Sequence, residues 1–355
     1  MKNTKHEKRI LFITLSNIGD VILTIPTLLK LSKRYKNAKF DIVGDDRSKI
    51  LFKYCPFINK FFIKDKSKGF MGTISLLRDI RKTNYDIAVD LRSDGLLYLI
   101  RANKKFHKIN NKNIHSIEKH YLSIKEQDKK IPEPTIWLSN EEKRKARKLL
   151  PKSYKKILAF GLGANSSHKI WPTKFYAELG NLLKQQFDLI VLIGDVKDNE
   201  FFSTFTKNYK GPLLNLSGKL DLLTTAAVLE KVQLFIGNDS GLGHIASAVN
   251  VNTFTIFGPG EPHRYRPWGE KARWIQDNQK EKALLFLEEM YNNKSLEQIY
   301  RELALYKYII INFENIQIKE IQDIANSITA NKIILGPYFH CLLYTSDAAD
   351  EGLGV

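Results

Sequence analysis

Short apolar runs alternate with amphipathic stretches along the first part of this chain, and no other sequence feature constrains its fold as strongly. Short apolar runs are typical of buried strands, whereas apolar residues at helical spacing are typical of helices. We expect strands at residues 8–15, 40–43, 61–63 and 85–91, and helices over 21–35 and 70–83. This order predicts a parallel sheet with helices on its faces.

The same alternation returns after a polar, basic connector at 103–134 and a charged helix at 140–150. We expect strands at 155–160, 189–193, 234–236 and 253–257, and helices over 173–187, 199–209, 222–231 and 242–249. The two parts share an architecture, although they show no internal sequence repeat. We therefore predict an α/β protein made of two facing Rossmann-like domains with parallel sheets and an interdomain cleft.

The length of 355 residues also fits two domains. We set them at residues 1–150 and 151–335, and the second would include helical stretches at 280–306 and 316–328. Residues 336–355 change in character and resemble vector-derived read-through. We expect them to form a non-native or disordered tail outside the fold.

The chain is strongly basic, with a formal net charge of +18 and dense Lys and Arg at 101–130 and 143–156. A solvated basic surface explains this charge most simply. The second interpretation is attraction to an anionic membrane leaflet, at about 1 kcal/mol for each nearby Lys or Arg. We expect no nucleic-acid partner, because the basic residues are mostly Lys without interleaved aromatic residues and no nucleic-acid-binding motif is present.

The cysteine content and the N-terminal region indicate a cytoplasmic protein. Cys55 and Cys341 are too few for a disulfide framework or a cysteine zinc site, and reduced thiols are usual in the cytosol. The N-terminal region has no signal-peptide cleavage site. Asp20 interrupts the apolar stretch at 10–31, which argues against a membrane span.

The first motif, Ser16-Asn17-Ile18-Gly19-Asp20, lies between the first expected strand and helix. Ligands of open α/β sheets bind at the carboxyl ends of strands. Gly19 allows a tight turn or the close approach of a ligand. The position of Asp20 by itself favours a helix cap or a first-turn acid. A dinucleotide fingerprint is absent.

The second motif runs from Gly161 to Pro172 after the first strand of the second part. Its glycines, including Gly163, and its small polar residues Asn165 and Ser166 are suited to presenting backbone N–H groups to an anion. Lys169 could add positive charge beside a phosphate. The alternative is a Gly-rich turn with a solvated Lys, since the G-K-[ST] of a P-loop is missing.

The third motif, Gly237 to His244, joins a buried strand to an Ala-rich helix. Ser240 and Gly241 would place free N–H groups at a helix start, where a diphosphate can bind. Asp239 could accept hydrogen bonds from ribose hydroxyl groups. A lone His244 would more often be structural, but the company of Asp239 and Gly241 favours a binding role.

The fourth motif follows the next strand and includes Gly258 and Pro259. These residues could line the cleft, but by themselves they are typical of an ordinary loop.

In this order, the motifs resemble those of glycosyltransferase family 9, the ADP-heptose:lipopolysaccharide heptosyltransferases. The similarity extends over about residues 10–328. The residues that carry it are Ile18-Gly19-Asp20-Val21, Pro26, Gly163, Lys169, Trp171-Pro172, Asn238-Asp239-Ser240-Gly241, His244 and Phe257-Gly258-Pro259.

The resemblance implies a GT-B fold and a metal-independent, inverting transfer of a sugar from a nucleotide-diphosphate donor. Asp20 would be the general base for the acceptor hydroxyl, and Lys169 would neutralise the diphosphate leaving group. The donor would be held by Ser16, Gly163, Asn165, Ser166, Asp239, Ser240, Gly241 and His244, with Gly19, Gly258 and Pro259 lining the cleft. Family members carry an acid after the strand at 189–193 that is thought to contact the adenosine, but residues 194–200 offer several acids and do not identify it.

The implied partners are a nucleotide sugar, such as ADP-heptose, and a lipid-linked saccharide of the lipopolysaccharide core. We expect no cofactor besides this co-substrate and no metal. The enzyme would be cytoplasmic. Its basic charge adds the interpretation that it makes peripheral contact with the anionic inner membrane. Two alternatives stay open, namely a related transferase with another donor or acceptor, and a non-catalytic nucleotide-sugar-binding protein on the same fold.

Overall fold

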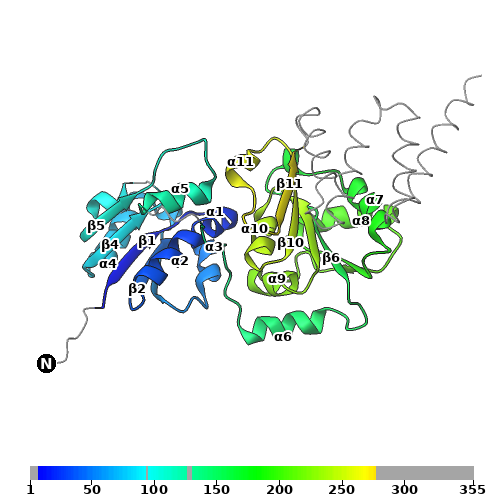
Figure 1. Ribbon diagram of the computed structural model, residues 1–355, viewed down its shortest axis with the longest axis horizontal. Coiled ribbons are helices and arrows are strands. Elements are labelled where there is room, and N and C mark those ends of the chain that lie inside the picture. Colours follow the sequence, from blue (N-terminus) through cyan, green and yellow to red (C-terminus); the bar gives the residue numbers. More distant parts are fainter. Residues whose placement is uncertain (1–6, 93–94, 126–129, 277–355) are drawn as a thin grey trace, which may run out of the picture.

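The computed structural model describes residues 7–92, 95–125 and 130–276, and the expected helices at 280–306 and 316–328 and the tail at 336–355 lie outside these ranges. The N-terminal half contains a five-stranded sheet in the order β3-β2-β1-β4-β5 (Figure 1). Every pairing in it is parallel. Its strands are β1 (Arg9–Ile13), β2 (Lys39–Gly44), β3 (Ile58–Ile63), β4 (Tyr85–Asp90) and β5 (Ala102–His107).

The side chains of β1 alternate between the two faces of this sheet, and helices cover both faces. Ile10 and Phe12 pack on the side of α2 (Ile25–Arg34), whose neighbour is α5 (Ser116–Ser123). Leu11 and Ile13 pack on the side of α4 (Gly69–Ile80) and η3 (Leu96–Leu99). Three-layer packing of this kind buries every apolar side chain of the central strand. The remaining short helices are α1 (Ile18–Ile22), α3 (Asp46–Lys49), η1 (Ile50–Phe52) and η2 (Lys66–Lys68).

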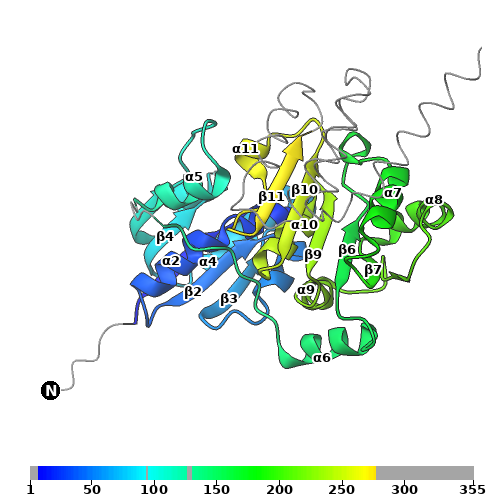
Figure 2. The same ribbon diagram turned by 45° about the vertical axis from the view of Figure 1, so that its right-hand side comes forward.

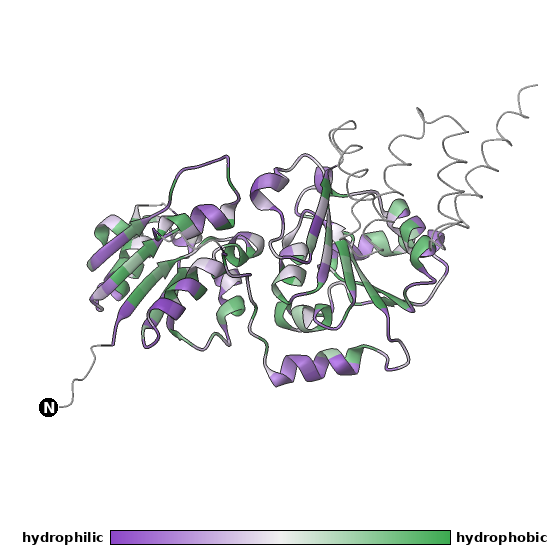
Figure 3. Ribbon diagram, in the orientation of Figure 1, coloured by the Kyte–Doolittle hydropathy of each residue, from purple (hydrophilic) through white to green (hydrophobic). Residues whose placement is uncertain are grey.

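The second half contains a six-stranded parallel sheet in the order β11-β10-β9-β6-β7-β8. Its strands are β6 (Ile157–Gly161), β7 (Leu189–Leu192), β8 (Leu213–Asn215), β9 (Leu234–Asn238), β10 (Asn252–Phe257) and β11 (Ala272–Gln276). Its helices are α7 (Thr173–Leu183), α8 (Glu200–Asn208), α9 (Leu222–Leu229), α10 (Gly241–Ala248) and α11 (Pro262–Tyr265), with η4 (Ser167–Lys169) and η5 (Val196–Asn199). The fold class is therefore the predicted one, two α/β halves with parallel sheets. Figure 3 shows the central strands of both sheets as hydrophobic and the linking helix α6 (Asn140–Leu149) as mostly hydrophilic.

The helix expected over 21–35 was wrong, because the structure divides it into α1 and α2. Pro26 occupies the first turn of α2, where its missing N–H does no harm, but in the interior of a longer helix it would remove a hydrogen bond. Helix α1 ends at Ile22 with Leu23 as its C-cap, and the hydroxyl of Thr24, the N-cap of α2, donates to the Val21 carbonyl oxygen at 2.7 Å.

The connector expected at 103–134 was also wrong in part, since it contains most of β5 and the whole of α5. β5 is an edge strand whose side chains are exposed or half-buried except for Phe106, so its sequence lacks the apolar run of a central strand. The edge strands β8 and β11 were missed as well. β8 is only three residues long, and β11 buries only Ile275.

Three of the contacts that join the halves lie outside the packing of α1 against α10. One apolar cluster runs through both, from Ile10 and Phe12 to Ala226 and Phe235. Both views place α11 beside α5 (Figures 1 and 2), where His115 Nε2 lies 2.9 Å from the Arg266 carbonyl oxygen. The third contact is made by α6.

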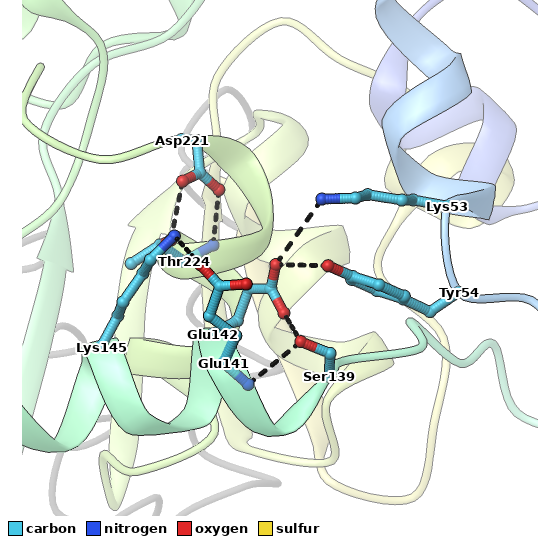
Figure 4. Close-up of polar contacts among 8 residues, drawn as sticks. All are labelled: Lys53, Tyr54, Ser139, Glu141, Glu142, Lys145, Asp221 and Thr224. Carbon is cyan, nitrogen blue, oxygen red and sulfur yellow. Dashed lines mark hydrogen bonds and ion pairs between the residues drawn. The ribbon is translucent and has the colours of Figure 1, made fainter.

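Helix α6 packs against α9 of the second half and also reaches the first half through one buried carboxylate. Figure 4 shows the Glu142 side chain between Ser139, Tyr54 and Lys53, with the Tyr54 hydroxyl donating to Glu142 Oε1 at 2.9 Å. Burial alone would raise the pKa of Glu142, but the hydrogen bonds from Ser139 and Tyr54 outweigh it and hold the pKa below its ordinary value. The domain boundary at residue 150 stays a prediction.

Tyr54→Phe removes one hydrogen bond to this buried carboxylate, and we expect the free energy of unfolding to fall by about 1–2 kcal/mol. Urea unfolding at neutral pH measures the change. Tyr35→Phe is the control, because the Tyr35 ring stacks with Lys8 and Arg34 in the same half and not with α6. Equal losses in the two variants would contradict a structural role for the Tyr54–Glu142 bond.

Candidate active site

A cleft of about 570 Å³ opens between the two halves, where the carboxyl ends of β1 and β9 face each other. Its walls contain ten of the residues predicted from sequence: Ser16, Gly19, Asp20, Asn165, Lys169, Asp239, Ser240, Gly241, His244 and Pro259. Arg47 and Tyr265 also line it and were not predicted, and Glu261 of the fourth motif lines it as well. Motifs that are more than 200 residues apart in the sequence thus lie together, because each follows the carboxyl end of a strand, where ligands of α/β sheets bind.

Asp20 occupies the first turn of α1, directly after β1. Asn17 is the N-cap residue, and its side chain donates from Nδ2 to Asp20 Oδ2 at 3.0 Å instead of capping the helix. Asp20 is therefore a first-turn acid, as its position indicated, and it also faces the cleft. The two interpretations of this residue are compatible.

Lys169 lies on the opposite wall, at the end of η4. Its ammonium donates to Asp239 Oδ2 at 2.5 Å, and the Asp239 side chain is only 12% exposed. This pair compensates a mostly buried carboxylate and fixes the lysine in the cleft. Lys169 thus faces the interior of the cleft instead of projecting into solvent.

Buried Asn238 holds the two donor-side loops together. Its Oδ1 accepts from the Trp171 backbone N–H and the Tyr176 hydroxyl, both at 2.9 Å, and its Nδ2 donates to the Leu162 carbonyl oxygen at 2.7 Å. Asn238 therefore positions the loop that carries Lys169. Its place in the third motif was visible in the sequence, but nothing there indicated this role.

The ring of His244 is buried on α10 and lies against Gly19 of the other half. A Cβ at position 19 would come within 2.7 Å of His244 Cδ2. Burial lowers the pKa of His244, although Asp239 and Asp20 oppose the effect. His244 is therefore a neutral imidazole near pH 7, able to donate one hydrogen bond.

A second pocket of about 500 Å³ adjoins the cleft, and both are lined by Ile18, Asn165, Ser240 and Gly241. Gly163 lines this second pocket and not the first. Ser166 and Gly258 line neither: Ser166 is the N-cap of η4, and Gly258 packs against the His168 carbonyl oxygen.

Two carboxylates and several apolar side chains line the second pocket, and sequence reasoning did not choose among them. Asp195 and Asp198 follow β7, and Leu220, Leu222 and Thr225 lie opposite in the lining. Burial raises the pKa of Asp198, against the opposing hydrogen bond from the Asp195 backbone N–H. The pocket thus combines an apolar wall with acceptors for hydroxyl groups.

Within the described ranges, no group of three or more His, Cys, Asp or Glu residues is arranged to hold a metal ion. Over the same residues, no helix is long and apolar enough to cross a membrane.

Gly163→Ala should destabilise this loop, because the added Cβ would lie 1.8 Å from Asp198 Oδ1. Asp198 is held by a capping box with Asp195, so it cannot yield freely. We expect a loss of about 1–3 kcal/mol in the free energy of unfolding. Gly241→Ala is the control, since its new Cβ would meet no atom closer than 3.6 Å. Denaturant unfolding of both variants checks this, and an undisturbed Gly163→Ala variant would contradict the described packing.

Comparisons with known proteins identify the family of this chain. Residues 92–293 match the model of the family described as glycosyltransferase family 9 (heptosyltransferase). Lipooligosaccharide heptosyltransferase 2 of Campylobacter jejuni is 26% identical over 274 residues, covering 73% of this chain and 83% of that protein. Lipopolysaccharide heptosyltransferase 3 of Escherichia coli K12 is 24% identical over 287 residues, covering 71% and 83%.

Solved structures share the fold. A family 9 glycosyltransferase from Veillonella parvula aligns with a TM-score of 0.70 at 21% identity, over 87% of this chain and 98% of that one. E. coli ADP-heptose LPS heptosyltransferase II aligns with a TM-score of 0.64 at 22% identity, over 75% and 90%. The two facing parallel-sheet halves are thus the GT-B fold. Because the family model covers more than half of the sequence, this chain belongs to glycosyltransferase family 9 and is a glycosyltransferase.

Proposed function

We propose that this enzyme transfers heptose from ADP-heptose to a lipopolysaccharide core acceptor, with inversion and without a metal. The observation that carries the proposal is the placement of Asp20 and the Lys169–Asp239 pair on opposite walls of one cleft. The names of the similar heptosyltransferases support the transfer of heptose and the acceptor, and the name of the similar E. coli structure, ADP-heptose LPS heptosyltransferase II, supports the donor.

The two pockets suit the two parts of the donor. The adenosine would occupy the second pocket, with its base against Leu220 and Leu222 and its ribose hydroxyls donating to Asp195 or Asp198. The diphosphate would lie where the pockets meet, at Ser240 and Gly241. These residues begin the eight-residue helix α10, whose free N–H groups and dipole favour an anion.

Asp20 would act as the general base. As the acceptor oxygen attacks the anomeric carbon, its proton passes to the Asp20 carboxylate, and the bond from that carbon to the diphosphate oxygen breaks. The attack comes from the face opposite the leaving ADP, because Asp20 and Lys169 lie on opposite walls, so the configuration inverts. A positioned base of this kind contributes about 10²–10⁴-fold to the rate.

Lys169 and the N-terminus of α10 would stabilise the negative charge that develops on the leaving ADP. Before transfer, Asp239 already compensates the charge of Lys169. The lysine therefore gains most when the diphosphate carries its full charge, and this differential stabilisation is what raises the rate.

We extend the proposal to location: the enzyme would work in the cytoplasm, in peripheral contact with the anionic inner membrane that carries its acceptor. The formal net charge of +18 supports this attraction.

Asp20→Asn should lower kcat for heptose transfer about 10²–10⁴-fold, since the amide keeps the shape but cannot take the proton. Transfer is measured with ADP-heptose and with a panel of other nucleotide sugars. Asp188→Asn is the control, because Asp188 is exposed and accepts hydrogen bonds from the Lys155 and Lys156 backbone away from the cleft. Full activity of Asp20→Asn would contradict the assignment of Asp20 as the general base. A wild-type protein that binds ADP-heptose but turns over no donor would favour the non-catalytic alternative.

Lys169→Ala should lower kcat about 10²–10³-fold with a smaller change in KM, because the lost interaction strengthens in the transition state. The substitution also leaves the buried Asp239 carboxylate unpaired, so the double variant Lys169→Ala/Asp239→Asn serves to separate folding from catalysis. Lys174→Ala is the matched control, because Lys174 is an exposed residue of α7 and its ammonium lies over the Phe175 ring. A double variant that folds and keeps wild-type kcat would contradict the role of Lys169.

A further inference from the structure

We propose that the outer face of α4 and η3 is a docking surface for an anionic lipid bilayer. Docking there would bring a membrane-borne acceptor to the cleft. Only this purpose of the docking surface rests on the proposed function. The docking surface is defined by five side chains: Phe70, Met71, Ile74, Tyr98 and Leu99.

These side chains are exposed to an unusual degree. Phe70 is 78% exposed, Met71 73% and Tyr98 76%. Among the described residues, nine large hydrophobic side chains are exposed, and five of the nine lie on α4 and η3. A concentration of exposed apolar side chains on one face marks an interaction site more often than a structural accident.

The same two elements are firmly packed on their inner side. Leu76 and Ile80 of α4, together with Leu96 and Leu97 of η3, share one buried cluster with Leu11 and Ile13 of the central strand β1. The exposed side chains are therefore not part of an incompletely packed core. They project from elements that are already anchored on one face of the sheet, on the N-terminal half where Figure 1 labels α4 beside β4 and β5.

The charge around the patch identifies the partner. Residues 60–82 contain seven Lys or Arg and two Asp, and the two acids are paired with Lys68 and Lys82. Arg78 and Arg81 are exposed at the end of α4 and just beyond it, and Arg101 is exposed after η3. An apolar face bordered by basic residues matches the acyl boundary and headgroups of an anionic bilayer. It does not match a second copy of a chain with net charge +18, which would bring like charges together.

The position of the docking surface relative to the cleft fits this partner. A third cavity, of about 840 Å³, lies between α3 and α4, and Arg47 lines both this cavity and the cleft. Ser75, Leu76 and Asp79 of α4 form part of its wall. A bilayer held by the outer side of α4 would therefore lie near this cavity, which shares Arg47 with the cleft that contains Asp20.

The test is binding of the full chain to vesicles, measured by flotation. Wild-type protein should bind vesicles of equimolar phosphatidylcholine and phosphatidylglycerol, and it should bind pure phosphatidylcholine much less. Phe70→Ser/Met71→Ser should raise the lipid concentration for half-binding at least about tenfold, because insertion scales with buried apolar area. Ile109→Ser/Leu122→Ser is the matched control, since it removes two exposed apolar side chains outside α4 and η3.

The assay needs neither donor nor transfer, so its outcome is separate from that of the proposed function. Transfer to a water-soluble acceptor fragment should be unchanged in Phe70→Ser/Met71→Ser, which also shows that the variant folds. The proposal is overturned if wild-type protein fails to bind anionic vesicles, if both double variants bind equally, or if the substitutions abolish a dimer in solution, since the face would then belong to a second copy.

Discussion

The close approach of Gly19 to the ring of His244 is the contact on which the geometry of the site depends. It brings the N-terminal end of α1 against α10, so the carboxyl edges of the two sheets meet. Any side chain at position 19 would collide with the imidazole at 2.7 Å and move the halves apart. Because this contact is so short, the proposed base Asp20 on one half and the proposed cation Lys169 on the other would reach a single sugar donor between them.

Several charged residues of the cleft wall form ion pairs. Lys169 is paired with Asp239, and Arg264 with Glu261. Buried Lys119 has a lowered pKa, caused first by burial and then by Lys108 and Arg264, with Asp20 opposing. A diphosphate would therefore be drawn by the N-terminus of α10 and by the re-pairing of Lys169, not by an uncompensated cationic cavity.

The sequence predicted the central strands and most of the site because both follow from local patterns. β1 and β6 are continuous apolar runs. The polar residues that follow them lie at the carboxyl edges of the sheets, because the strands of each sheet are parallel. Edge strand β5 exposes its lysines and buries only Phe106, so its pattern resembles a loop. Asp198 was not chosen among the acids after β7 because its pocket depends on contact with Gly163, 35 residues earlier in the chain. Such contacts are tertiary and leave no periodic signal.

Two of the contacts between the halves, His115 with Arg266 and Glu142 with Tyr54, respond to acid in the same direction. Burial lowers the pKa of His115 to about 3, so the imidazole that bonds to the Arg266 carbonyl is neutral in the folded state, while the unfolded chain binds a proton below pH 6.5. Glu142 has a lowered pKa, and its contribution is present above pH 4.5 and lost below it. Neither group changes its charge in the folded state near pH 7. Both contacts therefore keep their charge state near neutral pH, where the proposed base Asp20 would accept a proton.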